Sequence, residues 1–157
     1  YLNGEDIFSL SEDGRAELRG HLLGFVFQSF QLLSVLTAIE NVMLPLELAG
    51  VGNTYQIAFE ILERVGLEAR INHYPKQLSG GEQQRVAIAR AYATDPKILL
   101  ADEPTGNLDL STGNQIVDLL FELNREKRTT LILVTHDKTI SNRCTRQIRL
   151  NGGRIED

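Results

Sequence analysis

The stretch Lys97–Glu103, "KILLADE", decides the fold of this 157-residue chain. An uninterrupted apolar run, Ile98–Ala101, is followed directly by two acidic residues, Asp102 and Glu103. An apolar run of this length is typical of a strand buried on both faces, as in parallel sheets. The stretch therefore predicts a central strand of a parallel sheet that carries both acids at its carboxyl end.

Two other stretches show the same pattern and predict further buried strands. "TLILVTHD" (Thr130–Asp137) ends in polar residues after an apolar run, and "LLGFVFQ" (Leu22–Gln28) is apolar and aromatic up to its final glutamine. Amphipathic helical patterns separate the strands, which indicates an α/β domain with a mostly parallel sheet. Ligands of such sheets bind outside the carboxyl ends of the strands, where Gln28 and His136 are expected.

The region between the first and second predicted strands contains helical patterns and no strand signal. Along the whole chain, helices are expected at Ser11–Arg19, Ala38–Leu44, Asn53–Val65, within Gln77–Ala93 and at Thr112–Lys127. Pro45 is expected near the end of the second helix and Gly66 at the cap of the third. We predict an α/β core at about residues 1–28 and 96–157, with a helical subdomain at about residues 29–95. A small hairpin is expected around residues 151–153.

The bulk composition excludes several classes of protein. Its 42% apolar and 24% charged content is ordinary for a soluble globular domain. The net charge of −5 argues against a nucleic-acid partner, which needs a basic face. Cys144 is the single cysteine, so no internal disulfide forms. No apolar run approaches the ~20 residues that span a bilayer, so any link to a membrane is expected to go through a partner.

The polar groups at the predicted strand ends suit phosphate chemistry. Asp102 stands where an aspartate holds Mg²⁺, usually through water, and Glu103 could polarise an attacking water as a general base. His136 could donate to a phosphate oxygen. Each residue alone also fits an ordinary loop or structural role. Because the strand ends of one sheet converge in space, their joint occurrence favours a site.

The stretch Gln77–Ala93, "QLSGGEQQRVAIARAYA", points to the same chemistry. It reads as a helix that begins at Ser79-Gly80-Gly81. A helix N-terminus has unsatisfied N–H groups and a positive dipole end, and glycines allow close approach of a phosphate to the backbone. The alternative is a plain helix cap with a flexible entry.

Together these motifs resemble the nucleotide-binding subunit of ATP-binding-cassette (ABC) transporters. The matching motifs are a Q-loop glutamine (Gln28), a signature motif "LSGGEQQR" (Leu78–Arg85), a Walker B motif "ILLADEP" (Ile98–Pro104), a D-loop "GNLD" (Gly106–Asp109) and a switch histidine (His136). The resemblance covers essentially the whole chain and implies a partial P-loop NTPase fold of the RecA-like type with an inserted α-helical ABC subdomain. The sequence is most similar to the branch that contains the lipoprotein-release and macrolide-export ATPases.

The resemblance also implies roles for individual residues, with ATP and Mg²⁺ as cofactors. The catalytic residues would be Glu103, which activates water, His136, which contacts the γ-phosphate, and Gln28, which serves Mg²⁺ together with Asp102. The signature residues would bind ATP held by the opposite subunit of a head-to-tail homodimer; they are Leu78, Ser79, Gly80, Gly81 and Glu82. The D-loop residues at the dimer interface would be Asn107, Leu108 and Asp109.

The implied partner is an integral membrane permease, contacted by the helical subdomain. The resemblance thus implies a cytoplasmic protein that is peripheral on the inner face of the bacterial cell membrane. One family motif, the Walker A loop G-x-x-x-x-G-K-[ST], is not found, since no glycine of the chain is followed by lysine. We therefore expect the N-terminal strands and the phosphate loop to be missing, the chain alone to be inactive, and apolar surface to be exposed.

Two alternatives stay open at this point. One is a naturally truncated regulatory or dimerisation module without catalysis. The other is a non-transport ABC ATPase that acts on DNA or the ribosome.

Overall fold

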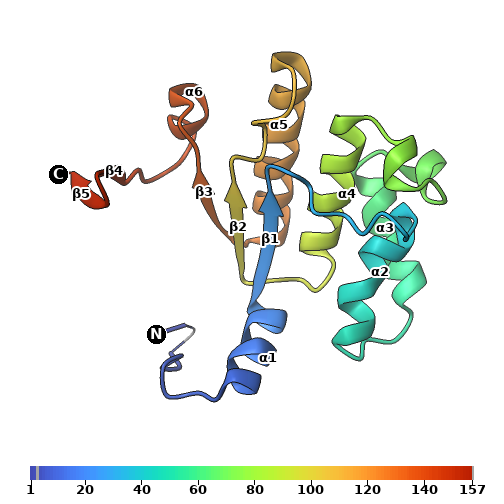
Figure 1. Ribbon diagram of the computed structural model, residues 1–157, viewed down its shortest axis with the longest axis horizontal. Coiled ribbons are helices and arrows are strands. Elements are labelled where there is room, and N and C mark those ends of the chain that lie inside the picture. The colour runs from blue at the N-terminus through green and yellow to red at the C-terminus, as the bar shows by residue number, and fades with distance from the viewer. Residues whose placement is uncertain (3, 157) are drawn as a thin grey trace.

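A three-stranded parallel sheet lies at the centre of the chain (Figure 1). The computed structural model describes residues 1–2 and 4–156. The strands are β1 (Leu23–Phe27), β2 (Ile98–Asp102) and β3 (Thr130–Val134), in the order β1-β2-β3. The parallel α/β class and all three strand positions predicted from the sequence are confirmed.

Helices precede, connect and follow the strands, and several of them lie between β1 and β2 in the sequence. They are α1 (Glu12–Leu22), α2 (Ala38–Leu48), α3 (Thr54–Arg64), α4 (Gly80–Tyr92), α5 (Leu110–Lys127) and α6 (Lys138–Ser141), with 3₁₀ turns at Glu68–Arg70 and Pro75–Gln77. An antiparallel hairpin of β4 (Arg149–Asn151) and β5 (Arg154–Glu156) confirms the predicted turn at residues 151–153. The pair Asn3-Gly4 near the start of the sequence predicts a further turn, but Asn3 lies outside the described residues.

The predicted end of α2 near Pro45 is wrong, because the helix continues to Leu48 with the proline inside it. Proline removes one N–H donor and disturbs one turn. Here the following turn is held by the bond from Ala49 N to Pro45 O, at 3.1 Å. Leu46 is almost completely buried, so the turn after the proline contributes to the core. The start of the helix at Ala38 is as predicted, because Thr37 and Glu40 form a capping box.

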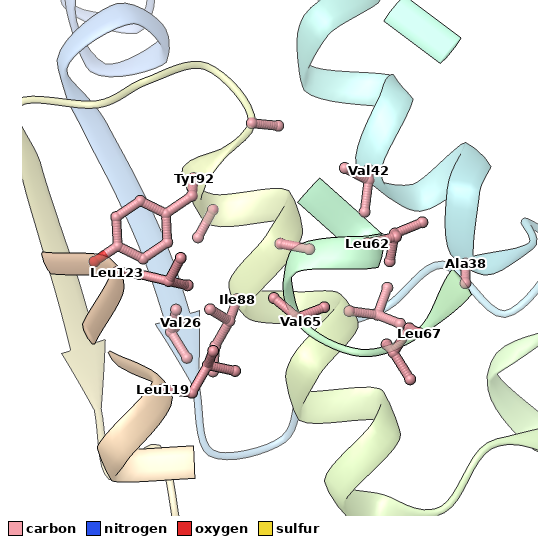
Figure 2. Packing of buried hydrophobic residues seen from close by; sticks show 14 of the residues in the cluster. Val26, Ala38, Val42, Leu62, Val65, Leu67, Ile88, Tyr92, Leu119 and Leu123 are labelled. Carbon is pink, nitrogen blue, oxygen red and sulfur yellow. The ribbon is translucent and has the colours of Figure 1, made fainter. Parts of the chain in front are cut away.

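One face of the sheet packs against α4 and α5 (Figure 2). Val26 of β1 lies among Ile88 and Tyr92 of α4 and Leu119 and Leu123 of α5. All five side chains are buried. This apolar contact fixes α4 against the strands, so the beginning of α4 keeps a defined position relative to the strand ends.

The opposite face of the sheet is the main departure from the predicted burial. Strands buried on both faces were expected, but the described chain leaves Phe25 36%, Ile132 48% and Val134 56% exposed. The register places Phe25 beside Leu100 and Leu100 beside Ile132, so these side chains form a continuous apolar surface. We call this surface, with Val134, the open sheet face. The exposed apolar surface predicted from the sequence is thus present.

The helices between β1 and β2 pack together to one side of the sheet (Figure 1). Their apolar residues, among them Ala38, Val42 and Leu62, belong to the same buried cluster as Val26 (Figure 2). The division into a core and a helical subdomain at about residues 29–95 stays a prediction. None of the helices formed by the described residues is long and apolar enough to span a membrane.

Candidate functional site at the strand ends

The carboxyl ends of the three strands bring the predicted chemical groups to one edge of the sheet. Phe27 pairs with Asp102 and Asp102 pairs with Val134, so the three strands end level with one another. Gln28, Glu103 and His136 follow directly or closely after these positions. The convergence expected from a parallel sheet therefore occurs.

Glu103 has an unusual backbone that is held on two sides. Its φ of 43° lies in the left-handed region, which a residue with a side chain rarely occupies. Its N–H donates to the carbonyl of Val134 at 3.0 Å, and its carbonyl accepts from Gly106 N at 3.0 Å. These bonds to β3 and to the following turn hold the backbone of Glu103 in this left-handed conformation.

The Glu103 carboxylate forms a pair with His136. Its Oε1 accepts from the backbone N–H of His136 at 3.0 Å and lies 2.7 Å from His136 Nδ1. An ionised carboxylate only accepts, so Nδ1 carries the proton and Nε2 is left for a ligand. The hydrogen bond from the imidazole to Glu103, followed by the charge of that carboxylate, raises the pKa of His136. The imidazole is 87% exposed and Glu103 24% exposed, so the pair is open to an incoming ligand.

Gln28 is tied to the segment that follows Glu103. Its Nε2 donates to Asn107 Oδ1 at 3.2 Å, and Asn107 Nδ2 donates to the Gln28 carbonyl at 3.0 Å. A Cβ on Gly106 would lie 2.5 Å from Gln28 Nε2, so a larger residue at position 106 would displace the exposed Gln28 amide. The first and second strand ends are thus connected within one chain through Asn107.

The beginning of α4 is capped by its own residues. Ser79 Oγ accepts from Glu82 N at 3.3 Å, and Glu82 Oε2 accepts from Ser79 N at 2.8 Å, which forms a capping box. The N–H of Ser79, followed by its hydroxyl and by Arg70 at 3.1 Å, lowers the pKa of the Glu82 carboxyl. The N–H groups of Gly80 and Gly81 have no acceptor within the helix, so they can bind an anion.

The two glycines also have a packing role that the sequence did not reveal. A Cβ on Gly81 would lie 2.6 Å from Thr112 Cγ2, and a Cβ on Gly80 would lie 3.3 Å from Leu108 Cδ2. The first turn of α4 therefore rests directly on the segment 108–112. This packing favours glycine at position 81 whether or not a phosphate approaches from the other side, whereas at position 80 a small movement of Leu108 would make room for a Cβ.

Asp109 has an intrachain partner in addition to its predicted interface role. Its Oδ1 accepts from Ser111 N and Thr112 N, each at 3.0 Å, and so caps α5. The hydrogen bonds of the Thr112 side chain and backbone lower the pKa of Asp109. This cap explains why α5 begins at Leu110 rather than at the predicted Thr112. The role of Asn107, Leu108 and Asp109 at a dimer interface stays a prediction.

Asp102 and Gln28 are the oxygen donors that suit Mg²⁺ at this edge. Asp102 is exposed at the end of β2, and Gln28 is exposed directly after Phe27, its neighbour in the register. The described residues contain no group of three or more His, Cys, Asp or Glu side chains that could hold a metal. This donor set fits Mg²⁺, which takes one or two protein ligands and completes its shell with water and substrate phosphates.

Two residues of α4 that were not predicted as site residues contact the segments that directly follow the strands. Gln84 is buried and donates through Nε2 to the carbonyl of Pro104 at 2.7 Å. Arg90 donates to the carbonyls of Gln31 at 2.6 Å and Phe30 at 2.9 Å. Helical spacing could have predicted that Gln84 is buried, because Ile88 and Ala91, at i+4 and i+7, lie on the same buried face.

Comparison with known proteins agrees with this geometry. The family model described as "ABC transporter" matches residues 1–106. The chain is 52% identical over 158 residues to the uncharacterized ABC transporter ATP-binding protein YbbA of Escherichia coli K12, covering 99% of this chain and 69% of that protein. It is 49% identical to the lipoprotein-releasing system ATP-binding protein LolD of Syntrophus aciditrophicus, covering 98% of this chain and 70% of LolD.

A solved structure shows the same fold. It is the dimeric structure of a post-hydrolysis state of the ATP-binding cassette MJ0796 bound to ADP and Pi. The TM-score is 0.89 at 44% identity, over 100% of this chain and 70% of that one. The resemblance inferred from the motifs is confirmed, and the fold matches part of a complete cassette. The chain therefore belongs to the ABC transporter family, as an ATP-binding cassette.

Proposed function

We propose that this chain acts in the ATP-hydrolysing subunit of an ABC transporter and couples hydrolysis in a head-to-tail homodimer to a membrane permease. The observation that carries the proposal is the Glu103–His136 pair, fixed at the strand ends by the left-handed backbone of Glu103. The dimeric state named for MJ0796 supports the dimer. YbbA is named an ABC transporter ATP-binding protein and LolD a lipoprotein-releasing system ATP-binding protein, and these names support a permease partner. With such a partner, the chain would be peripheral on the inner face of the bacterial cell membrane.

Glu103 is proposed to act as the general base. Its Oε1 is engaged by His136, whereas Oε2 accepts no hydrogen bond from the part of the chain that the structure describes. Oε2 is therefore free to take a proton from a water molecule that attacks the γ-phosphate. The outer nitrogen of His136, Nε2, would donate to the phosphate when the ring is protonated.

Asp102 and Gln28 are proposed to hold Mg²⁺. The ion, when bound, would neutralise negative charge on the phosphates. Leu78, Ser79, Gly80, Gly81 and Glu82 would bind the nucleotide of the partner subunit through the α4 N-terminus. Because these 157 residues contain no Walker A loop, we expect them alone to bind MgATP weakly and to hydrolyse none.

The proposal is tested by Glu103→Gln in a cassette completed with a Walker A segment of the family ahead of Tyr1. The amide keeps the shape of the side chain but cannot act as a base, so turnover is expected to fall by ~10²–10⁴-fold while ATP binding is retained. Turnover is measured by phosphate release and binding by calorimetry.

The matched control for this test is Glu17→Gln, the same exchange at an exposed position of α1. It should leave turnover unchanged, and the 157 residues alone serve as the inactive background. Unchanged turnover in Glu103→Gln would remove Glu103 from the catalytic role. A complete protein that never co-purifies with an integral membrane protein would contradict the transport role.

A further inference from the structure

Gln84 is a polar residue in an otherwise apolar part of the core. It is completely buried on α4, between α4 and the segment that follows β2. The Pro104 carbonyl can only accept, so the Gln84 atom at 2.7 Å from it must be the donating Nε2. Gln84 Oε1 is buried without a hydrogen-bond partner among the described residues.

The unpartnered oxygen indicates that Gln84 does not occupy this position merely to fill space in the core. A buried polar atom without a partner destabilises the folded state, and an apolar side chain of the same size would avoid this cost. What a glutamine adds at this position is therefore the single hydrogen bond to the Pro104 carbonyl.

Pro104 directly follows Glu103, and the carbonyl that Gln84 binds belongs to the next peptide, between Pro104 and Thr105. The backbone of Glu103 is already held by Val134 O and Gly106 N, and its left-handed φ needs support from its surroundings. Gln84 supplies a third attachment, on the next residue and from a different element.

Gln84 also lies on the same face of α4 as the glycines at the start of that helix. It follows Gly81 by three positions and Gly80 by four, and such residues are neighbours on a helix surface. Gly80 faces Leu108 and Gly81 faces Thr112. The face of α4 that carries Gly80, Gly81 and Gln84 therefore contacts the segment 104–112. A shift of the α4 N-terminus would thus reach the Pro104–Thr105 peptide, one residue after Glu103.

We propose that Gln84 is a positioning residue that couples the anion-binding start of α4 to the orientation of the Glu103 carboxylate. The mechanistic meaning of this coupling rests on the proposed ATPase function, in which the α4 start binds the partner's nucleotide. When Gln84 is removed, the Pro104 peptide turns, and Glu103 then meets His136 in an altered geometry. The contact itself exists whether or not the protein hydrolyses ATP.

The test is Gln84→Met in the 157-residue chain, with the titration of the His136 ring followed by NMR. Methionine keeps the length and volume but has no amide. The bond from His136 to Glu103 raises the pKa of the ring, so a displaced Glu103 should lower the midpoint. We expect Gln84→Met to shift the midpoint by at least about half of the shift that Glu103→Gln produces.

Gln83→Met is the matched control, because it is the same exchange on the same helix and the Gln83 amide donates to Leu78 O instead. It should leave the His136 midpoint in place. Gln84→Asn, which keeps an amide but is one methylene too short to reach Pro104, is the second variant and should behave like Gln84→Met. A wild-type midpoint in whichever of the two variants is folded overturns the proposal, as does an equal shift in Gln83→Met.

Turnover in the completed cassette gives an independent measurement. A misoriented base should lower kcat by about 10- to 100-fold with little change in KM for ATP. A change in KM alone would contradict the positioning role. If the completed wild-type cassette hydrolyses no ATP, the proposed function fails, while the NMR titration still decides the role of Gln84.

Discussion

At the scale of single residues, Gly81 makes one of the tight contacts of the site. The helix start was expected to need glycine so that a phosphate could approach, and the structure shows a second need, on the side of Thr112. A single sequence cannot distinguish these reasons, because both produce the same two letters at a helix start. The distinction depends on which helix lies behind α4, and that is a property of the tertiary fold.

Gly81→Ala should therefore destabilise the chain even without nucleotide. The new Cβ would lie 2.6 Å from Thr112 Cγ2, and such overpacking typically costs about 1–3 kcal/mol. Urea unfolding followed by circular dichroism measures the loss. Adding Thr112→Ser removes the opposing methyl group and should restore most of the stability.

The control for this prediction is Gly52→Ala. A Cβ at Gly52 meets nothing within 4 Å, so its effect should stay within about 0.5 kcal/mol. If Gly81→Ala were equally mild, α4 and α5 would not be in the close contact described here.

The chemical groups of the site could be predicted from the sequence more completely than the contacts between them. Glu103 and His136 were predicted at strand ends from the apolar runs before them. Their 2.7 Å pair depends on β2 and β3 being neighbours, and periodicity does not specify the order of parallel strands. Gln84 was within reach of prediction, since its helical spacing places it on the buried face.

At the scale of elements, α4 is attached to two strand ends. Near its beginning, Gln84 holds Pro104 after β2, and near its end, Arg90 holds Phe30 and Gln31 after β1. Burial lowers the pKa of the Arg90 guanidinium, whose two bonds satisfy the carbonyls of residues with φ of 59° and 49°. Two consecutive left-handed residues are unfavourable without such support.

Arg90→Met should release this loop. Both donors are lost while the aliphatic stem is replaced, so amide hydrogen exchange at residues 28–36 should accelerate at least about tenfold, with a loss of roughly 1–3 kcal/mol in unfolding free energy. Exchange measured by mass spectrometry on peptides from this region tests the effect.

Arg85→Met is the control, because Arg85 lies on the same helix but donates to Val65 O at 3.0 Å. Exchange at residues 28–36 should not respond to it. Equal acceleration in both variants would mean that α4 is loosened as a whole and that Arg90 has no special relation to the loop.

Elements with strong periodicity were predicted well, and local rules failed where tertiary burial outweighed them. The apolar stripes of α3 and α5 predict the ends of both helices to within one turn of the observed ends. The local rule for Pro45 predicts that α2 ends near it, yet Leu46 is buried in the core and the helix continues to Leu48. A helix propensity describes one residue, whereas burial in the core stabilises the whole turn that carries the buried residue.

At the scale of the whole molecule, the helices cover one side of the sheet and leave the other in solvent. Parallel sheets are normally covered on both faces. The open sheet face joins Phe25, Leu100, Ile132 and Val134 across all three strands. An apolar surface of this kind favours association, because contact with another surface removes it from water.

We expect the 157-residue chain to self-associate through the open sheet face. The double substitution Ile132→Lys with Val134→Lys places two charges there and should shift the population to monomer by at least about tenfold in sedimentation velocity. Leu48→Lys, at an exposed apolar residue at the end of α2, should leave association as in the wild type. A wild-type chain that is already monomeric at high concentration would contradict this prediction.

The left-handed backbone of Glu103 has a consequence for selection experiments. A residue with a side chain at φ of 43° costs of order 1–3 kcal/mol, and glycine would relieve most of that strain. A library screened only for thermal resistance would therefore enrich glycine at position 103 and discard the proposed general base in doing so. If Glu103 has that role, heat tolerance and turnover are in conflict at this position, and a screen for robust variants has to hold residue 103 constant.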